Sequence, residues 1–236
     1  MIKITSLYKK FGKLTVLDHL NLSIDKGGVF AVLGPNGSGK TTLIKCLLGM
    51  VIPNKGEVAF QGKSVLKQHS YRNDFNYLPQ IANFPANLTV IELITMVKNL
   101  RPKPANENEL IKQFGLQEFL TKKLRNLSGG TKQKVNIVLT FMFDSPLIIL
   151  DEPTTGLDPI ALLYLKELIK KERDNGKTIL ITTHIMSVVE ELADEIVFLL
   201  DGKIYFKGSV PKLKEQTKQE NLEHAIATLI SKQYQN

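Results

Sequence analysis

The glycine-rich stretch Gly34–Thr42, with the sequence GPNGSGKTT, constrains the fold of this chain more than any other feature. It follows the apolar run 29–33, and apolar residues recur after it at the spacing of one helix face. A strand, a glycine-rich turn and a helix in this order form the setting in which the pattern G-x-x-x-x-G-K-[ST] binds phosphate. The alternative is an ordinary glycine turn that caps a helix, and the flanking strand disfavours it.

The residues of this loop suit a chain of phosphate groups. Glycines let backbone N–H groups turn inward, and the helix that begins near Lys40 adds the positive end of its dipole. Lys40 supplies a cation for the β- and γ-phosphates, the Thr41 hydroxyl can bind Mg²⁺, and Thr42 can reach the α-phosphate. We therefore assign nucleotide binding to the whole loop: Gly34, Pro35, Asn36, Gly37, Ser38, Gly39, Lys40, Thr41 and Thr42.

Strand and helix signals alternate along most of the chain, which predicts an α/β fold with a mainly parallel sheet. Residues 2–24 differ, because they read as two strands joined near residues 11–13, an N-terminal antiparallel β portion. Between about residues 86 and 145 the strand signals vanish. A capping box of Thr89 and Glu92 opens the first of several helices there, so we expect an inserted helical subdomain.

After residue 145 the alternation resumes, with buried strands predicted at 147–151 and 178–183 and a hairpin at 196–207. Ser187 followed by Glu190 predicts the N-cap of a helix. Residues 211–236 predict a short helical tail that is mostly polar. The chain therefore reads as one domain over residues 1–210 followed by this tail.

Composition limits where the chain acts. The single cysteine, Cys46, excludes an internal disulfide and fits a reducing compartment. The N-terminus has no charged region followed by an apolar core, so we expect no signal peptide. No apolar run approaches the ~18–20 residues needed to cross a bilayer. We expect a cytoplasmic protein that, at a membrane, relies on the transmembrane helices of another chain.

The net charge of +8 permits binding to nucleic acid, to an anionic membrane surface or to nucleotide. The basic residues are spread out, with one cluster at 122–125 and others along 203–218. The sequence has neither a basic stripe interleaved with aromatic residues nor a nucleic-acid-binding motif. Solvated surface lysines account for the excess, and no nucleic-acid partner is expected.

A second set of chemical residues lies at the ends of two predicted strands. Asp151 follows the apolar run 147–150, and in a parallel sheet ligand groups cluster at the carboxyl ends of strands. Asp151 would lie beside the phosphates held by Lys40 and bind Mg²⁺, while Glu152 accepts a proton from an attacking water. His184 ends the next buried strand and can hydrogen-bond the γ-phosphate. A solvated turn would explain Asp151 and Glu152 alone, but not their pairing with a phosphate loop.

The stretch 127–134, with the sequence LSGGTKQK, offers a second anion site. It combines the hydroxyl of Ser128, the small residues Gly129 and Gly130, and the start of a helix. One nucleotide does not need a second cradle within the same subunit. In a head-to-tail pair, however, each subunit could close the nucleotide of the other, so we expect a second ATPase subunit, in a homodimer, as partner.

These motifs resemble those of ATP-binding cassette (ABC) ATPases, the nucleotide-binding subunits of ABC transporters, over about residues 1–210. They come in the family's order: the adenine-stacking aromatic at Phe11, the Walker A loop at Gly34–Thr42, the Q-loop at Gln80, the signature at Leu127–Gly130, Walker B with the catalytic glutamate at Leu147–Glu152, the D-loop at Gly156–Asp158 and the switch histidine at His184. The resemblance implies an ABC ATPase fold, which is a P-loop NTPase core with a helical subdomain, and hydrolysis of ATP with Mg²⁺.

The resemblance also implies roles for the matched residues. Those that take part in hydrolysis would be Glu152, His184 and Gln80. The Mg²⁺ ligands would be Thr41, Gln80 and Asp151. The contacts to ATP of the opposite subunit would be Ser128, Gly129, Gly130 and Asp158, although helix capping alone also explains Asp158. The family signature usually continues with Gln where this chain has Thr131, so no contact is assigned to that residue.

The partners implied by the resemblance are transmembrane permease subunits, which place the chain on the cytoplasmic face of the cell membrane. The run 127–136 further resembles ATPases of the copper-processing system that matures nitrous oxide reductase, and the short chain resembles ATPases of exporter-type permeases. The alternative is a soluble ABC-type ATPase acting on DNA or ribosomes, but heptads are absent and the chain has one cassette. A nucleotide-binding module without hydrolysis is disfavoured by Glu152 and His184.

Overall fold

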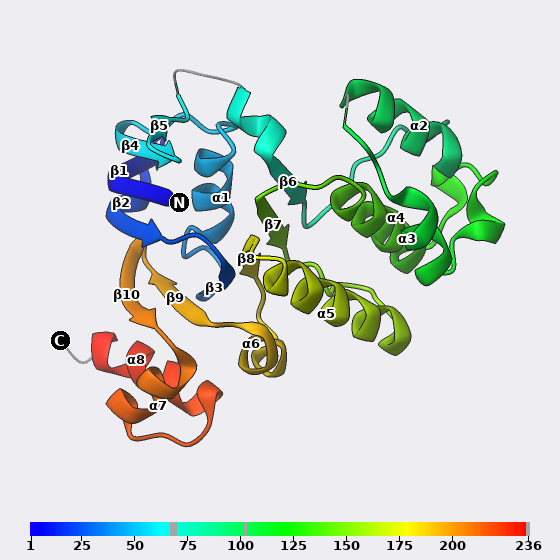
Figure 1. The fold of residues 1–236 in the computed structure, drawn as a ribbon. Helices are drawn as coiled ribbons and strands as arrows, with labels where there is room; N and C mark the ends of the chain where they lie inside the picture. Colours follow the sequence, from blue (N-terminus) through cyan, green and yellow to red (C-terminus); the bar gives the residue numbers. More distant parts are fainter. Residues whose placement is uncertain (67–69, 102, 235–236) are drawn as a thin grey trace.

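The computed structural model describes residues 1–66, 70–101 and 103–234, which form two sheets and the helices around them (Figure 1). The N-terminal sheet is antiparallel, in the order β2-β1-β4-β5. Its strands are β1 (Ile2–Phe11), β2 (Leu14–Ile24), β4 (Lys55–Phe60) and β5 (Lys63–Ser64). The predicted N-terminal antiparallel portion is therefore confirmed.

The 6-stranded sheet has the order β10-β9-β3-β8-β7-β6 and is parallel except for β10 at its edge. Its strands are β3 (Gly28–Leu33), β6 (Phe75–Leu78), β7 (Leu147–Asp151), β8 (Thr178–Thr182), β9 (Glu195–Leu200) and β10 (Lys203–Gly208). The predicted α/β class with a mainly parallel sheet is confirmed. Because β3, β7 and β8 run in the same direction, their carboxyl ends open on one edge of the sheet.

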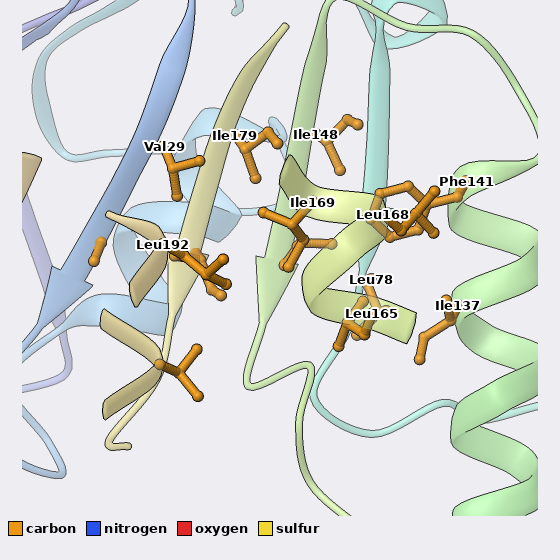
Figure 2. Packing of buried hydrophobic residues seen from close by; sticks show 14 of the residues in the cluster. Val29, Leu78, Ile137, Phe141, Ile148, Leu165, Leu168, Ile169, Ile179 and Leu192 are labelled. Atoms are coloured by element: carbon orange, nitrogen blue, oxygen red, sulfur yellow. The ribbon is translucent and has the colours of Figure 1, made fainter. Parts of the chain in front are cut away.

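Side chains on the two faces of the parallel sheet enter two different cores. On β3, Val29 and Ala31 face one core while Phe30 and Val32 face the other, the alternation of a strand buried on both sides. The first core includes α5 (Pro159–Asp174) and α6 (Met186–Leu192), and Figure 2 shows Ile169 of α5 above the strands. The second includes α1 (Lys40–Leu47) and the antiparallel sheet.

Three helices lie together at the far side of the molecule from the antiparallel sheet: α2 (Val90–Leu100), α3 (Glu107–Gln113) and α4 (Gly129–Phe141) (Figure 1). The predicted capping box at the start of α2 is confirmed, since the Thr89 hydroxyl accepts from Glu92 N and the Glu92 carboxylate accepts from Thr89 N. Ile137 and Phe141 of α4 belong to the first core, in which Figure 2 labels them together with Leu165 and Leu168 of α5. The boundaries 86–145 for a separate subdomain stay a prediction.

The end of the chain folds into α7 (Val210–Thr217) and α8 (Leu222–Tyr234), so the predicted helical tail is confirmed for the described residues. Residues 235 and 236 of that tail lie outside them. The tail is mostly polar in sequence, as expected, and its apolar residues Leu213, Leu222 and Ala225 are buried in the core that also holds α5 and α6. A boundary at residue 210 stays a prediction.

One predicted helix cap is wrong. Helix α6 begins at Met186, with Ile185 in the N-cap position, so Ser187 lies inside the first turn and cannot cap it. The hydroxyl of Thr183 instead accepts from Ile185 N at 3.2 Å. Across the described residues, no helix combines the length and the apolar character that a membrane span requires.

Candidate nucleotide-binding site

The carboxyl edge of the parallel sheet holds a cavity of about 270 Å³. It is lined by Leu14, Val16, Asn36, Gly37, Gly39, Lys40, Thr41, Thr42, Gln80, Asp151 and Glu152. The fold thus brings the glycine-rich loop, Gln80 and the two acids after β7 to one place, although they lie far apart in the sequence. Such a crevice at the carboxyl ends of parallel strands is where ligands bind in open α/β sheets.

At two glycines of the loop, Gly34 and Gly39, the backbone lies too close to its neighbours for a side chain. Gly39 adopts φ 105°, and a Cβ there would lie 2.8 Å from the Val16 carbonyl oxygen. A Cβ on Gly34 would overlap the Leu199 carbonyl oxygen. Ser38 Oγ is buried and has no hydrogen-bond partner among the described residues. A buried hydroxyl without a partner is destabilising, so the loop is suited to a ligand that supplies an acceptor.

Lys40 begins α1 and turns back over the loop. Its Nζ donates to the carbonyl oxygens of Gly34 at 2.7 Å and Pro35 at 3.0 Å. Burial lowers the pKa of Lys40, while Glu152 and Asp151 oppose that shift. The ammonium therefore stands at the cavity wall beside two carboxylates, where the negative charge of a phosphate would offset its partial loss of water.

Asp151 ends β7 and is buried. It pairs across the parallel ladder with Thr182, and the Thr182 hydroxyl donates to Asp151 Oδ1 at 2.6 Å. This bond fixes the carboxylate at the cavity, where the hydroxyl of Thr41 and the amide of Gln80 also lie. All three offer hard oxygen ligands, the donor set that Mg²⁺ prefers.

The described residues contain no group of three or more His, Cys, Asp or Glu side chains that could hold a metal ion. Mg²⁺ is typically held by one or two carboxylates together with substrate phosphates and water, and Asp151 supplies one carboxylate at the cavity. The residues at the cavity therefore fit Mg²⁺ that arrives with a nucleotide.

Glu152 has an unusual backbone, with φ 50° in the left-handed region. For a residue other than glycine this conformation costs of order 1–3 kcal/mol and persists only where neighbours impose it. Glu152 N donates to the carbonyl oxygen and to the hydroxyl of Thr182, both at 3.0 Å. His184 Nδ1 donates to Glu152 Oε2 at 2.9 Å. The carboxylate is thus buried at the cavity and oriented by an exposed histidine.

Phe11, the predicted adenine platform, lies at the end of β1 and does not line the cavity. Phe11 is 49% exposed as a residue, and Lys9 Nζ lies 4.7 Å from the centroid of its ring. Leu14, its partner in the β1–β2 ladder, does line the cavity, together with Val16. These two apolar residues were not predicted as site residues, although their alternation along β2 places them on one strand face.

The predicted trans contacts lie outside this cavity. Ser128 and Gly129 are exposed at the start of α4, and the Ser128 hydroxyl accepts from Thr131 N at 3.2 Å. A Cβ on Gly130 would lie 2.6 Å from the Gly156 carbonyl oxygen, so the signature packs directly on the D-loop of its own chain. The structure therefore separates the predicted phosphate-binding residues into two groups.

Asp158 also lies outside the cavity and has two partners of its own. Its carboxylate accepts from Ala161 N at 2.9 Å, the N-cap bond of α5, and pairs with Lys134 Nζ at 2.6 Å. The hydrogen bond from Lys134, followed by that from Ala161, lowers the pKa of Asp158. Capping therefore accounts for Asp158 without a nucleotide, and its contact with a second subunit stays a prediction.

Sequence comparisons place the chain in a family. A family model described as ABC transporter matches residues 17–155, and one described as "AAA domain, putative AbiEii toxin, Type IV TA system" matches the shorter stretch 122–190. The lantibiotic transport ATP-binding protein SrtF of Streptococcus pyogenes is 37% identical over 227 residues, which cover 94% of each chain.

Solved structures agree with this relationship. An ATP-binding subunit of an ABC transporter superposes with a TM-score of 0.91 at 29% identity, covering 98% of this chain and 99% of that one. A dimeric ATP-binding cassette in a post-hydrolysis state, bound to ADP and Pi, superposes with a TM-score of 0.79 at 27% identity, covering 89% and 98%.

The fold and site thus define an ATP-binding cassette. The chain belongs to the ABC transporter family: it is an ATP-binding subunit of an ABC transporter and an ATPase. The predicted family, fold and activity are confirmed, and an ATPase acting on DNA or ribosomes is not favoured. The resemblance to copper-processing ATPases stays a prediction.

Proposed function

We propose that two copies of this chain close head to tail around two ATP molecules, and that hydrolysis of this ATP drives separate transmembrane permease subunits. The observation that carries the proposal is the separation of two phosphate-binding elements within one chain. Six residues of the glycine-rich loop line the cavity, namely Asn36, Gly37 and 39–42, whereas Ser128 and Gly129 are exposed outside it. A second copy could bring its own Ser128–Gly130 to the open side of the cavity. The dimeric relative bound to ADP and Pi supports this arrangement.

Within one subunit, different residues of the site would bind different parts of ATP. Backbone N–H groups of the glycine-rich loop and the Lys40 ammonium bind the phosphates, Thr42 reaches the α-phosphate, and the apolar Leu14 and Val16 lie nearby with Phe11 to pack against adenine. Thr41, Gln80 and Asp151 would hold Mg²⁺. Mg²⁺ held by these residues would supply positive charge against the negative charge that develops on the phosphate oxygens.

Glu152 is the proposed general base. Its carboxylate accepts a proton from water while the water oxygen bonds to the γ-phosphorus and the bond from that phosphorus to the β–γ bridging oxygen breaks. ADP and phosphate result. His184, already bonded to Glu152 Oε2 at 2.9 Å, orients the carboxylate and would hydrogen-bond the γ-phosphate, although it does not itself line the cavity.

The dimer can be tested in a Glu152→Gln background, which slows hydrolysis and preserves bound ATP. We expect this protein to dimerise with ATP in size-exclusion chromatography with light scattering. Adding Ser128→Arg should abolish that dimer, because a long side chain fills the second phosphate cradle. Ser23→Arg, at an exposed position on β2, is the matched control and should leave the dimer intact.

Two results would contradict this proposal. A Glu152→Gln protein that stays monomeric at saturating ATP, with Mg²⁺ present or absent, would count against ATP-driven closure. A dimer that forms equally well with Ser128→Arg would mean that the subunits meet through another surface.

The proposed permease contact lies on the helical side of the molecule. The outer face of α2 carries a groove of about 460 Å³ lined by Ile91, Glu92, Thr95, Met96, Asn99 and Leu100. Ile81, directly after Gln80, is 73% exposed. Phe84, by contrast, is half-buried against the core. Exposed apolar side chains on α2 and at Ile81, which follows the cavity residue Gln80, support docking of a cytoplasmic permease segment on this side, at the cytoplasmic face of the membrane.

A photo-crosslinking residue at position 81 should therefore label the permease in the intact membrane complex. A crosslinker at Ile52, which is 70% exposed but lies by the antiparallel sheet, is the matched control and should not. Labelling from position 52 alone, or labelling confined to the ATPase, would place the permease contact elsewhere.

The cargo is set by the permease, and two resemblances suggest different cargo. SrtF is named for lantibiotic transport, which favours export of a peptide, whereas the run 127–136 favours copper processing. The genes that flank this one distinguish the two. A lantibiotic precursor or modification gene beside a permease gene supports peptide export, and a periplasmic copper or nitrous oxide reductase gene contradicts it.

A further inference from the structure

Helix α4, which begins at the signature, carries a line of buried polar residues along its inner face. Gln133, Asn136 and Thr140 recur at helical spacing, and Gln133 is 6% exposed. Gln133 Nε2 donates to the Pro153 carbonyl oxygen at 2.9 Å. Asn136 Nδ2 donates to the Pro79 carbonyl oxygen at 3.2 Å. The helix is thus bonded to the turn after β7 and to the residue before Gln80.

The Gln133 contact is specific to the turn that carries the general base. A buried amide is destabilising unless its donors are paired. If Gln133 only filled space in the core, an apolar side chain of similar size would serve better at this position. The acceptor of this amide belongs to Pro153, the residue next to Glu152. Proline has a fixed φ, so a restraint on its carbonyl also limits how its neighbour can move.

Glu152 is held from both sides. On one side its N–H is bonded twice to Thr182, and on the other side Gln133 holds the carbonyl of Pro153. The left-handed φ of 50° at Glu152 needs such restraints, because a non-glycine residue relaxes to negative φ when it is released. Relaxation would swing the carboxylate away from the cavity and from His184.

We propose that Gln133 is a positioning residue for the general base, acting through the Pro153 carbonyl to keep Glu152 in its left-handed conformation. This inference rests on the proposed role of Glu152. Helix α4 would also link the two ATP sites of a dimer. Its start presents Ser128 and Gly129 toward the partner subunit, and Gln133, about one turn further on, bonds to the turn that carries Glu152 of the same chain. Gly130 and Gly156, in direct backbone contact, join the same two segments.

The test replaces Gln133 by Met, which keeps the length of the side chain but cannot donate, and by Glu, which keeps the shape. Misplacement of a catalytic group by about 1 Å can lower a rate roughly 100-fold, so we expect kcat for ATP hydrolysis to fall about 10-fold to 100-fold in both variants. KM and the Kd for ATP should stay within about twofold of wild type, because the cavity residues that bind ATP are unchanged. Nucleotide titration also reports whether each variant is folded.

Thr140→Val is the matched control, since Thr140 is a buried polar residue on the same face of α4 whose hydroxyl donates to Asn136 O at 2.8 Å and lies 3.5 Å from Tyr77 O, both away from the turn after β7. It should keep wild-type kcat. A double-mutant comparison tests whether Gln133 acts through Glu152. In the Glu152→Gln background, Gln133→Met should lower kcat no further.

Three results would overturn the inference. These are a wild-type kcat in a Gln133 variant that binds ATP, an equal loss of kcat in Thr140→Val, and a further tenfold loss in the Glu152→Gln background. A Gln133→Met protein that cannot fold leaves Gln133→Glu to decide. If Glu152→Gln itself retains wild-type kcat, the proposed base is wrong, which is a different failure from the loss of the Gln133 contact.

Discussion

Replacing Glu152 by Gln is expected to lower kcat for ATP hydrolysis by about 10²–10⁴-fold, the usual effect of losing a general base. The amide keeps the size of the side chain and an oxygen that can accept from His184 Nδ1, but it cannot take a proton from water. ATP binding should survive, because Lys40, Thr41 and Asp151 remain at the cavity. Steady-state phosphate release gives kcat, and calorimetric titration gives the Kd for ATP.

The control for this prediction is Glu223→Gln, the same chemical change at an exposed position on α8. It should leave both kcat and Kd unchanged. A Glu152→Gln protein that keeps more than a tenth of wild-type kcat would contradict the assignment of the base. A large rise in Kd would instead mean that Glu152 contributes to binding the nucleotide.

The glycine-rich loop was predictable because its signals are local. The apolar run before it, the glycines and the apolar spacing after it all lie within about twenty residues and agree with one another, which is the condition for a reliable motif. The N-cap of α5 was equally local, since Asp158 and Pro159 sit at adjacent positions and the carboxylate accepts from Ala161 N. Local chemistry alone fixes such features.

The restraints on the acidic residues were not predictable, because they depend on strand register. Thr182 bonds both Asp151 and Glu152 only because β8 pairs with β7 in the register Asp151↔Thr182. No pattern in the sequence near residue 182 predicts that Thr182 bonds to Asp151 and Glu152. The left-handed φ of Glu152 follows from the same pairing together with Gln133, which reaches the turn from a different helix.

The helix cap predicted at Ser187 failed for a related reason. The pattern S-x-x-E satisfies a local rule, but the hydroxyl of Thr183, at the end of β8, accepts from Ile185 N and the helix begins earlier. Leu213 and Leu222 lie in a tail that is mostly polar in sequence, and the structure buries both against the main core. Tertiary contacts thus determine both the start of α6 and the burial of the two leucines.

Lys40→Ala is expected to weaken ATP binding strongly with little effect on the fold. Lys40 Nζ donates to the loop carbonyls of Gly34 and Pro35, and a phosphate would replace these neutral acceptors by charged ones. Loss of a charge-assisted hydrogen bond costs about 1.5–3 kcal/mol. That free energy corresponds to a Kd for ATP that is roughly 10-fold to 150-fold higher. Isothermal titration with ATP measures this ratio directly.

Lys45→Ala is the matched control, because Lys45 lies on the same helix α1 with its side chain exposed. It removes the same charge from the chain and should leave the Kd unchanged, which separates a local phosphate contact from a general loss of positive charge. Thermal unfolding without nucleotide should give similar midpoints for both variants, since Lys40 contributes no apolar side chain to either core. Equal ATP affinities for Lys40→Ala and wild type would contradict the phosphate contact and move the binding site away from α1. A Lys40→Ala protein with a much lower melting temperature would mean instead that its bonds to Gly34 and Pro35 hold the loop together.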